Sequence, residues 1–288
     1  MIGQTVLEDR KVIFLVLAFF SSALVSVLMR CSDSKVKSSM GMLAVNYVVC
    51  TLLAAIESGA DLIPMEEGLG QAVSLGVVNG FFYLGGFVLL RYNISHSGVV
   101  LSSTFMKLGL LVTMLISVLF FREEPGLPQI IGFVLAVAAI VLINGVPGKG
   151  SGSFRPALLL LTLTGGMCDG MSKIFEELEN PALSEHFLFF TFFTAMILCL
   201  VLAPFKKEFP GKWEWLFGIL VGVPNFYACR FLLLSLSTVP GVIAYPVYAV
   251  AGILLVTLAG VALFREKLTR RQWVALAVIM GALILLNI

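Results

Sequence analysis

Lys107 lies deep inside an apolar stretch of the chain, where a charged side chain is costly. The stretch covers about residues 97–121, and Lys107 is about 3 residues from its midpoint, or ~5 Å along a helix axis. A lysine at that depth costs ~2.5–3.5 kcal/mol on membrane-insertion scales. Ser103 lies one turn before it on the same helical face. We interpret Lys107 as a cavity-lining cation that pairs with an anionic substrate group or a protein carboxylate. The alternative is a structural cation bound to backbone carbonyls at a helix break.

Two asparagines recur at matching places in the two halves of the chain. Gly76-Val77-Val78-Asn79 is echoed by Gly222-Val223-Pro224-Asn225. Glycine or proline breaks at corresponding places in two halves indicate a binding site near the middle of the membrane. Asparagine also forms hydrogen bonds between membrane helices, so Asn79 and Asn225 are either site residues or interhelical contacts.

Two tyrosines could add an aromatic wall to such a site. Tyr245 and Tyr248 are spaced i, i+3 around Pro246. On a helix they present aromatic surface with hydroxyl groups to one side. This pattern is typical of a binding-site wall and equally of the aromatic belt at a membrane interface.

The remaining charged candidates lie in the second half. Asp169 is the only acid well inside an apolar stretch, which makes it the candidate for proton coupling. Lys173 follows in the i, i+4 order that favours a local ion pair, and this pairing is the preferred interpretation. Arg230 lies ~7 Å from the middle of its own stretch. It is either a second substrate-facing cation or a side chain that extends to the interface.

The segments that carry these side chains have the composition of membrane-crossing helices. Of the 288 residues, 59% are hydrophobic and 12% charged, about half the charged share of a soluble globular protein. The mean hydropathy is +1.02. Runs of about 18 or more apolar residues are long enough to cross ~30 Å of hydrocarbon. We predict an all-α polytopic membrane protein with ten transmembrane helices, at about residues 12–30, 40–57, 69–91, 97–121, 127–144, 156–173, 184–204, 213–236, 240–264 and 269–287.

One long segment of the chain occurs twice. Residues 97–144 match residues 240–287 at a constant offset, which places Phe121-Arg122-Glu123 on Phe264-Arg265-Glu266. A repeat of this length predicts two copies of one structural unit.

The copies are assigned to residues 1–147 and 148–288, with a flexible linker at Gly145–Arg155 where they meet. Each copy holds five spans. Because five is odd, the second copy enters the membrane from the opposite side, so the two five-helix repeats are inverted. The offset places Val250 at the position of Lys107, so the shared scaffold does not require a cation there.

The sequence argues against several other classes of protein. Two histidines and five scattered cysteines have no metal-ligand or disulfide spacing, and we expect neither a metal nor a cofactor. An intramembrane enzyme would need a nucleophile with a base, paired aspartates or a metal cluster, and none is found, so we expect no enzyme. A channel would need a continuous polar stripe, whereas the polar positions gather near mid-span. The net charge of +2 gives no indication of a nucleic-acid partner.

The repeated unit resembles the drug/metabolite transporter superfamily, and within it the EamA-type branch. The likeness rests on five-plus-five spans, on glycine in the fourth and ninth spans, and on the F-R-E-(E/K)…Q…N hairpin that closes each half. It covers essentially the whole chain. It implies a central cavity lined mainly by spans 1, 3, 4, 6, 8 and 9, with spans 5 and 10 at the periphery. The first span lacks the embedded glutamate of the small multidrug pumps of this superfamily, which argues against their mechanism.

The combined prediction is a secondary active transporter, an exporter or exchanger, in the cell (inner or plasma) membrane. The expected substrate is a small polar metabolite, anionic or zwitterionic such as an amino acid, bound in a midplane cavity during alternating access. The alternative is export of cationic or amphipathic drug-like compounds. Expected partners are the substrate, membrane lipid, and protons or a counter-substrate, with the protein a monomer or weak dimer.

Orientation is predicted from the positions of lysine and arginine. Loops after the odd-numbered spans carry most of them, which places those loops in the cytoplasm and both termini outside. The nucleotide-sugar members of the superfamily are understood to have both termini in the cytosol, so the resemblance implies the opposite orientation.

Overall fold

The computed structural model describes residues 2–59, 68–120, 126–144, 156–178, 181–236 and 241–285, and the predicted linker lies outside them. Every regular element in this part of the chain is helical. The elements are α1 (Ile2–Ser32), α2 (Ser39–Glu57), α3 (Leu69–Ser97), α4 (Val99–Lys107), α5 (Leu110–Phe120), α6 (Leu127–Asn144), α7 (Pro156–Leu178), the 3-10 turn η1 (Pro181–Leu183), α8 (Ser184–Lys206), α9 (Lys212–Leu236), α10 (Gly241–Ala262) and α11 (Arg270–Leu285).

Several helices are long and apolar enough to cross a membrane. Seven segments of the described chain have the necessary length and hydropathy: Ile13–Ser32 of α1, α2, α3, Val99–Phe120 across α4 and α5, Pro156–Phe175 of α7, α8, and Lys212–Ser235 of α9. Shorter apolar segments lie in α6 and α10, at Leu127–Ala139 and Val247–Ala262. The prediction of an all-helical protein with several membrane spans is confirmed.

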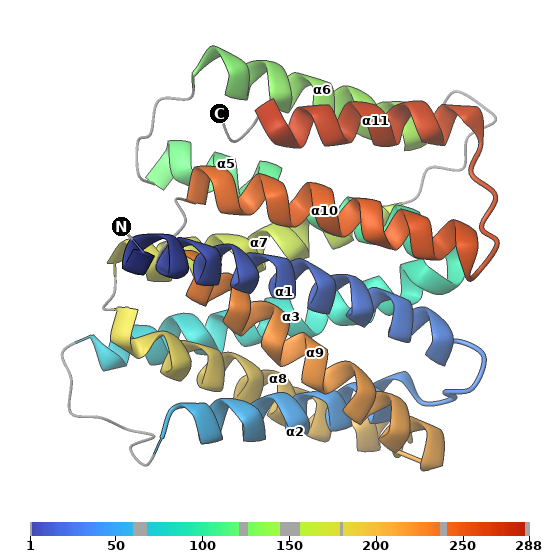
Figure 1. The fold of residues 1–288 in the computed structure, drawn as a ribbon. Helices are drawn as coiled ribbons and strands as arrows, with labels where there is room; N and C mark the ends of the chain where they lie inside the picture. The colour runs from blue at the N-terminus through green and yellow to red at the C-terminus, as the bar shows by residue number, and fades with distance from the viewer. Residues whose placement is uncertain are drawn as a thin grey trace.

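The helices lie side by side with their axes roughly along one direction (Figure 1). α1 packs against α9 and α10, α3 packs against α7 and α8, and α2 packs against α8 and α9. α6 and α11 pack against each other at one edge of the molecule (Figure 1). α1 begins and α11 ends on the same side of the bundle. The interior is therefore built mainly from contacts between helices that are distant in sequence.

The breaks expected at the two matching glycines are absent, because α3 and α9 are continuous helices. A Cβ atom at Gly76 would lie 2.9 Å from the carbonyl oxygen of Phe187 in α8. A Cβ atom at Gly222 would lie 2.9 Å from the carbonyl oxygen of Asn46 in α2. Both glycines therefore permit close helix packing, which is the usual role of small residues between membrane helices.

The fourth predicted span contains the break instead. α4 ends at Lys107 and α5 begins at Leu110. A Cβ atom at Gly109 would lie 2.5 Å from the backbone nitrogen of Gly166, so only glycine fits where the break crosses α7. The hydroxyl of Thr162 in α7 donates to the Phe105 carbonyl at 2.8 Å and satisfies an acceptor beside the break. The corresponding Gly252 lies within continuous α10.

The repeated F-R-E motif has a structural role in its second copy. The Glu266 carboxylate accepts hydrogen bonds from the backbone N–H groups of Val99 at 2.7 Å and Val100 at 3.2 Å, at the start of α4. It also lies 3.8 Å from the guanidinium of Arg30 at the end of α1. A carboxylate at a helix N-terminus satisfies unpaired donors and interacts favourably with the helix dipole. Glu266 thus ties the end of α10 to the starting turn of α4.

Candidate substrate cavity

A cavity of about 120 Å³ lies between the two halves of the chain. Its walls come from α1, α3, α4, α7, α9 and α10, with one residue from α8. The lining residues are Ser22, Val25, Ser26, Asn79, Tyr83, Gly86, Phe87, Leu90, Met106, Lys107, Gly165, Cys168, Asp169, Ser172, Leu188, Asn225, Ala228, Cys229, Leu232, Leu233 and Tyr248. The surface is mostly apolar, with a few polar groups at separate points, as is usual in small-molecule sites.

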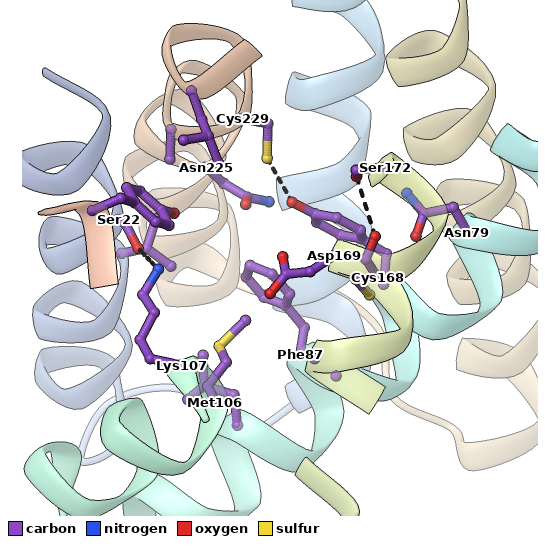
Figure 2. Close-up of a pocket in the computed structure, with 18 of the residues that line it drawn as sticks. Ser22, Asn79, Phe87, Met106, Lys107, Cys168, Asp169, Ser172, Asn225 and Cys229 are labelled. Carbon is purple, nitrogen blue, oxygen red and sulfur yellow. Dashed lines mark hydrogen bonds between the residues drawn. The ribbon is translucent and has the colours of Figure 1, made fainter. Parts of the chain in front are cut away.

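Lys107 reaches into this cavity from the end of α4 (Figure 2). Its ammonium donates a hydrogen bond to the Ser22 hydroxyl at 3.1 Å and lies 3.5 Å from the centroid of the Tyr248 ring. Hydroxyl and ring stabilise the cation without neutralising it. Within the described part of the chain Lys107 forms no salt bridge and no hydrogen bond to a carbonyl. Its charge is therefore available to an anionic group that enters the cavity.

Room for the lysine stem comes from a glycine on the opposite helix. A Cβ atom at Gly252 of α10 would lie 3.6 Å from Cε of Lys107, so any larger side chain would compete for this space. The break after Lys107 places the lysine on the last residue of a short helix, with its stem directed along α10. In the sequence, this arrangement is indicated by Gly109 and Gly252, which occupy matching positions in the repeated segment.

Asp169 lies on α7 in the same cavity, and Figure 2 shows its carboxylate near the centre of the view. Among the described contacts it forms no ion pair with Lys107, nor the predicted pair with Lys173. Asp169 and Lys107 are the only carboxylate and the only cation among the described lining residues. The described lining therefore presents one acidic and one basic side chain that form no salt bridge with each other.

Both matching asparagines line the cavity and are buried. Asn79 Nδ2 donates to the Thr191 hydroxyl of α8 at 3.4 Å. Asn225 Nδ2 donates to Asn46 Oδ1 of α2 at 3.3 Å and lies 3.4 Å from Cys50 Sγ. Each asparagine thus makes an interhelical contact and also lines the cavity, and a role for either in substrate binding stays a prediction.

Three other predicted residues occupy different surroundings. Ser103 is absent from the cavity lining, and its hydroxyl donates to lining residue Ser26 at 2.9 Å. Arg230 is also outside the lining; its guanidinium contacts the carboxylates of Glu57 and Glu185, at the ends of α2 and α8. The side chain of Tyr245 lies outside the described residues. The structure therefore brings together Lys107, Asn79, Asn225, Tyr248 and Asp169.

Sequence reasoning missed several residues of the cavity wall. Ser22 and Ser26 are spaced i, i+4 within the apolar first span, a polar stripe that could have been noticed. Tyr83 follows Asn79 by one helical turn, and Cys229 follows Asn225 by the same spacing. Tyr83 Oη and Cys229 Sγ are 2.6 Å apart. Extending the asparagine match by one turn would have identified both.

The geometry suits reversible binding of a small polar solute. Polar lining groups include an ammonium, a carboxylate, amides and hydroxyls, while no group of three histidine, cysteine or acidic residues that could hold a metal occurs in the described chain. An all-helical protein with several membrane spans around such a cavity has the build of a membrane transporter.

Comparison with known proteins gives the family. The chain matches the EamA-like transporter family over residues 9–145 and again over residues 158–288. It belongs to that family, the EamA branch of the drug/metabolite transporter superfamily, and the resemblance noted from the sequence is confirmed. Family membership identifies the chain as a membrane transporter and points away from an enzyme.

Two similar proteins have low sequence identity to this chain. An uncharacterized protein of Haemophilus influenzae (strain ATCC 51907 / DSM 11121 / KW20 / Rd) is 22% identical over 282 residues, which cover 93% of this chain and 95% of the relative. A solved crystal structure of a protein with 17% identity has a TM-score of 0.57 and covers 94% of this chain and 97% of its own. The structural similarity concerns the fold alone.

Proposed function

We propose that this protein is a secondary active transporter, an exporter or exchanger, of a small polar metabolite that is anionic or zwitterionic, such as an amino acid. The observation that carries this proposal is the Lys107 ammonium in the cavity, held by Ser22 and Tyr248 and left without a salt bridge in the described residues. A cation inside a membrane-protein cavity that forms no salt bridge among the described residues favours a ligand with a carboxylate or phosphate.

The proposed architecture is ten transmembrane helices in two inverted five-helix repeats, residues 1–147 and 148–288. The packing supports it. In the two proposed halves α1 corresponds to α7, α2 to α8, α3 to α9 and α6 to α11. The contact between α1 and α9 therefore corresponds to a contact between α7 and α3, and both are observed. Likewise, the contact between α2 and α9 corresponds to the observed contact between α8 and α3. The contacts of α6 with α11 and of α2 with α8 each join two corresponding helices. α1 begins and α11 ends on one side of the bundle, which fits an even number of crossings (Figure 1).

The proposed mechanism is alternating access around the cavity. Two related halves in opposite orientations can exchange conformations, and this exchange turns an outward-open state into an inward-open state. The lining comes from both halves, so movement of one half against the other would open the cavity to either side in turn. Asp169 is the proposed group for coupling to protons or to a counter-substrate. The proposed location is the cell membrane.

The test is transport by the purified protein in liposomes. We expect saturable uptake of an amino acid or another small carboxylate, and counterflow when unlabelled substrate is loaded inside. Non-saturable flux without counterflow would indicate a channel, and transport confined to amphipathic cations would favour the drug-export alternative. Absence of transport for all these classes would contradict the proposed function.

A further inference from the structure

The cavity contains acceptor groups that lack a donor within the described part of the protein. Asn79 is 1% exposed, and its Oδ1 accepts no hydrogen bond there, although its Nδ2 donates to Thr191. The Asp169 carboxylate likewise has no hydrogen bond or ion pair among the described residues. These two groups line the same cavity from α3 and α7, which pack against each other.

A buried acceptor without a donor is uncommon in folded proteins. It has lost its hydrogen bonds to water and gained none in return, so it is most stable when a ligand or ordered water supplies the donor. Asn79 Oδ1 is such an atom; it is itself buried, and Asn79 is a lining residue of the cavity. The missing partner is therefore a hydrogen-bond donor, and the neighbouring carboxylate favours a donor with positive charge.

Lys107 and Asp169 contribute opposite charges to the cavity from two different helices, α4 and α7. Lys107 reaches in from α4 towards Ser22 of α1, and Figure 2 shows the Asp169 carboxylate between Lys107 on one side and Asn79 on the other. Arg230, the second candidate for a substrate-facing cation, contacts Glu57 and Glu185 outside the lining. The charges of the described lining residues thus balance, which suits a ligand that carries both signs.

We propose that Asp169 and Asn79 form a subsite for a primary ammonium group, and we call it the ammonium subsite. An ammonium has three hydrogen-bond donors, and the subsite offers a carboxylate and an amide oxygen as acceptors. The substrate is then a zwitterion whose carboxylate binds Lys107 and Ser22 while its ammonium binds the ammonium subsite. This inference rests on the proposed function, because it names the substrate class of the same cavity.

The test uses matched probes with the full-length protein in detergent. The probes are L-amino acids, each compared with its N-acetyl derivative, which keeps the carboxylate and loses the ammonium. Ligands that bind the folded state raise the melting temperature by mass action. We expect one or more amino acids to raise it by ~2–4 °C at saturation and their N-acetyl derivatives to have no effect.

Variants assign this preference to the ammonium subsite. Asp169→Asn should lower the affinity for the amino acid at least ~10-fold, which is the effect of losing a charged hydrogen-bond partner. Asp169→Glu keeps the carboxylate and should retain the preference for the free amine. Asn79→Leu should weaken amino-acid binding in the same direction. Glu177→Gln is the matched control, an exposed acid on the same helix outside the cavity lining, and should bind like the wild type.

Several outcomes would overturn the ammonium subsite. The first is stabilisation of the wild type by N-acetyl derivatives to the same extent as by the parent amino acids. The second is unchanged amino-acid binding by Asp169→Asn. The third is the absence of stabilisation by any amine-bearing probe. If amine-free carboxylates are instead bound and transported in a manner that depends on Lys107, the proposed transporter stands and the ammonium subsite fails. If none of the tested substrate classes is transported in the liposome assay, the proposed function itself is contradicted.

Discussion

Tyr83 and Cys229 meet across the two halves of the chain, with Tyr83 Oη 2.6 Å from Cys229 Sγ. In the proposed repeat they occupy equivalent positions, because the sequence match of Asn79 with Asn225 also places Tyr83 on Cys229. Equivalent positions can touch only close to the axis that relates two units. Both residues line the cavity, so the cavity lies where the proposed two-fold axis of the repeats would pass.

Cys229 gives a direct probe of access to the cavity. In a variant that keeps Cys229 as its only cysteine, a small charged methanethiosulfonate reagent should react and inhibit transport, because the thiol lines the cavity. Substrate should slow the reaction. A variant with Cys199 as its only cysteine is the control, because that thiol is fully buried and outside the lining. Equal reaction of the two variants, measured by mass spectrometry, would contradict the cavity assignment.

The break between α4 and α5 should depend on glycine at its crossing with α7. Gly109→Ala places a Cβ atom against the backbone of Gly166, and we expect a loss of ~1–3 kcal/mol in stability from overpacking. Gly281→Ala is the control, since nothing lies within 4 Å of a Cβ atom there. Alanine should leave stability unchanged or raise it by ~0.5–1 kcal/mol within that helix. Thermal unfolding of both variants measures this, and a Gly109→Ala protein as stable as Gly281→Ala would refute the close crossing.

Glu266 should contribute to stability through the start of α4. Glu266→Gln removes the negative charge of the carboxylate that accepts hydrogen bonds from Val99 and Val100. We expect the free energy of unfolding to fall by ~1–2 kcal/mol. The exposed Glu177→Gln change should cost less than ~0.5 kcal/mol. Hydrogen exchange at the amides of Val99 and Val100 reports on the cap itself. Unchanged protection of these amides in Glu266→Gln would show that the carboxylate does not hold them.

The charge distribution predicts that both termini lie outside the cytoplasm. A phosphatase fused after Ile288 should be active, and a fluorescent protein fused there should be dark. The physical reason is the excess of lysine and arginine in the loops after odd-numbered spans. A silent phosphatase together with a fluorescent fusion would establish the opposite orientation, which the nucleotide-sugar members imply.

The helices were largely predictable, since long apolar runs are read directly from the sequence. Contacts between helices were harder. The hydrogen bond from Lys107 to Ser22 joins residues 85 positions apart, and a single sequence contains no information on the relative rotation of the two helices. Arg230 shows the same limit, because its partners Glu57 and Glu185 lie on two other helices.

The glycines illustrate a different ambiguity. Glycine weakens a helix and also allows a neighbouring helix to approach, and the sequence does not separate these effects. At Gly76 and Gly222 the close approach prevails, because neighbouring carbonyls lie where a Cβ atom would be. At Gly109 the close approach coincides with an interrupted helix. The break at Gly109 lies where the chain packs against α7, and no local sequence pattern contains this contact.

The proposed binding of the substrate by Lys107 is tested by the Lys107→Met variant. Methionine keeps the apolar stem but removes the charge, so the protein should fold and insert with equal or greater thermal stability, because a costly charge has been removed. Uptake of an anionic or zwitterionic substrate into liposomes should be abolished. Stability and uptake are measured on the same preparation. Normal uptake by a stable Lys107→Met protein would show that Lys107 does not bind the substrate.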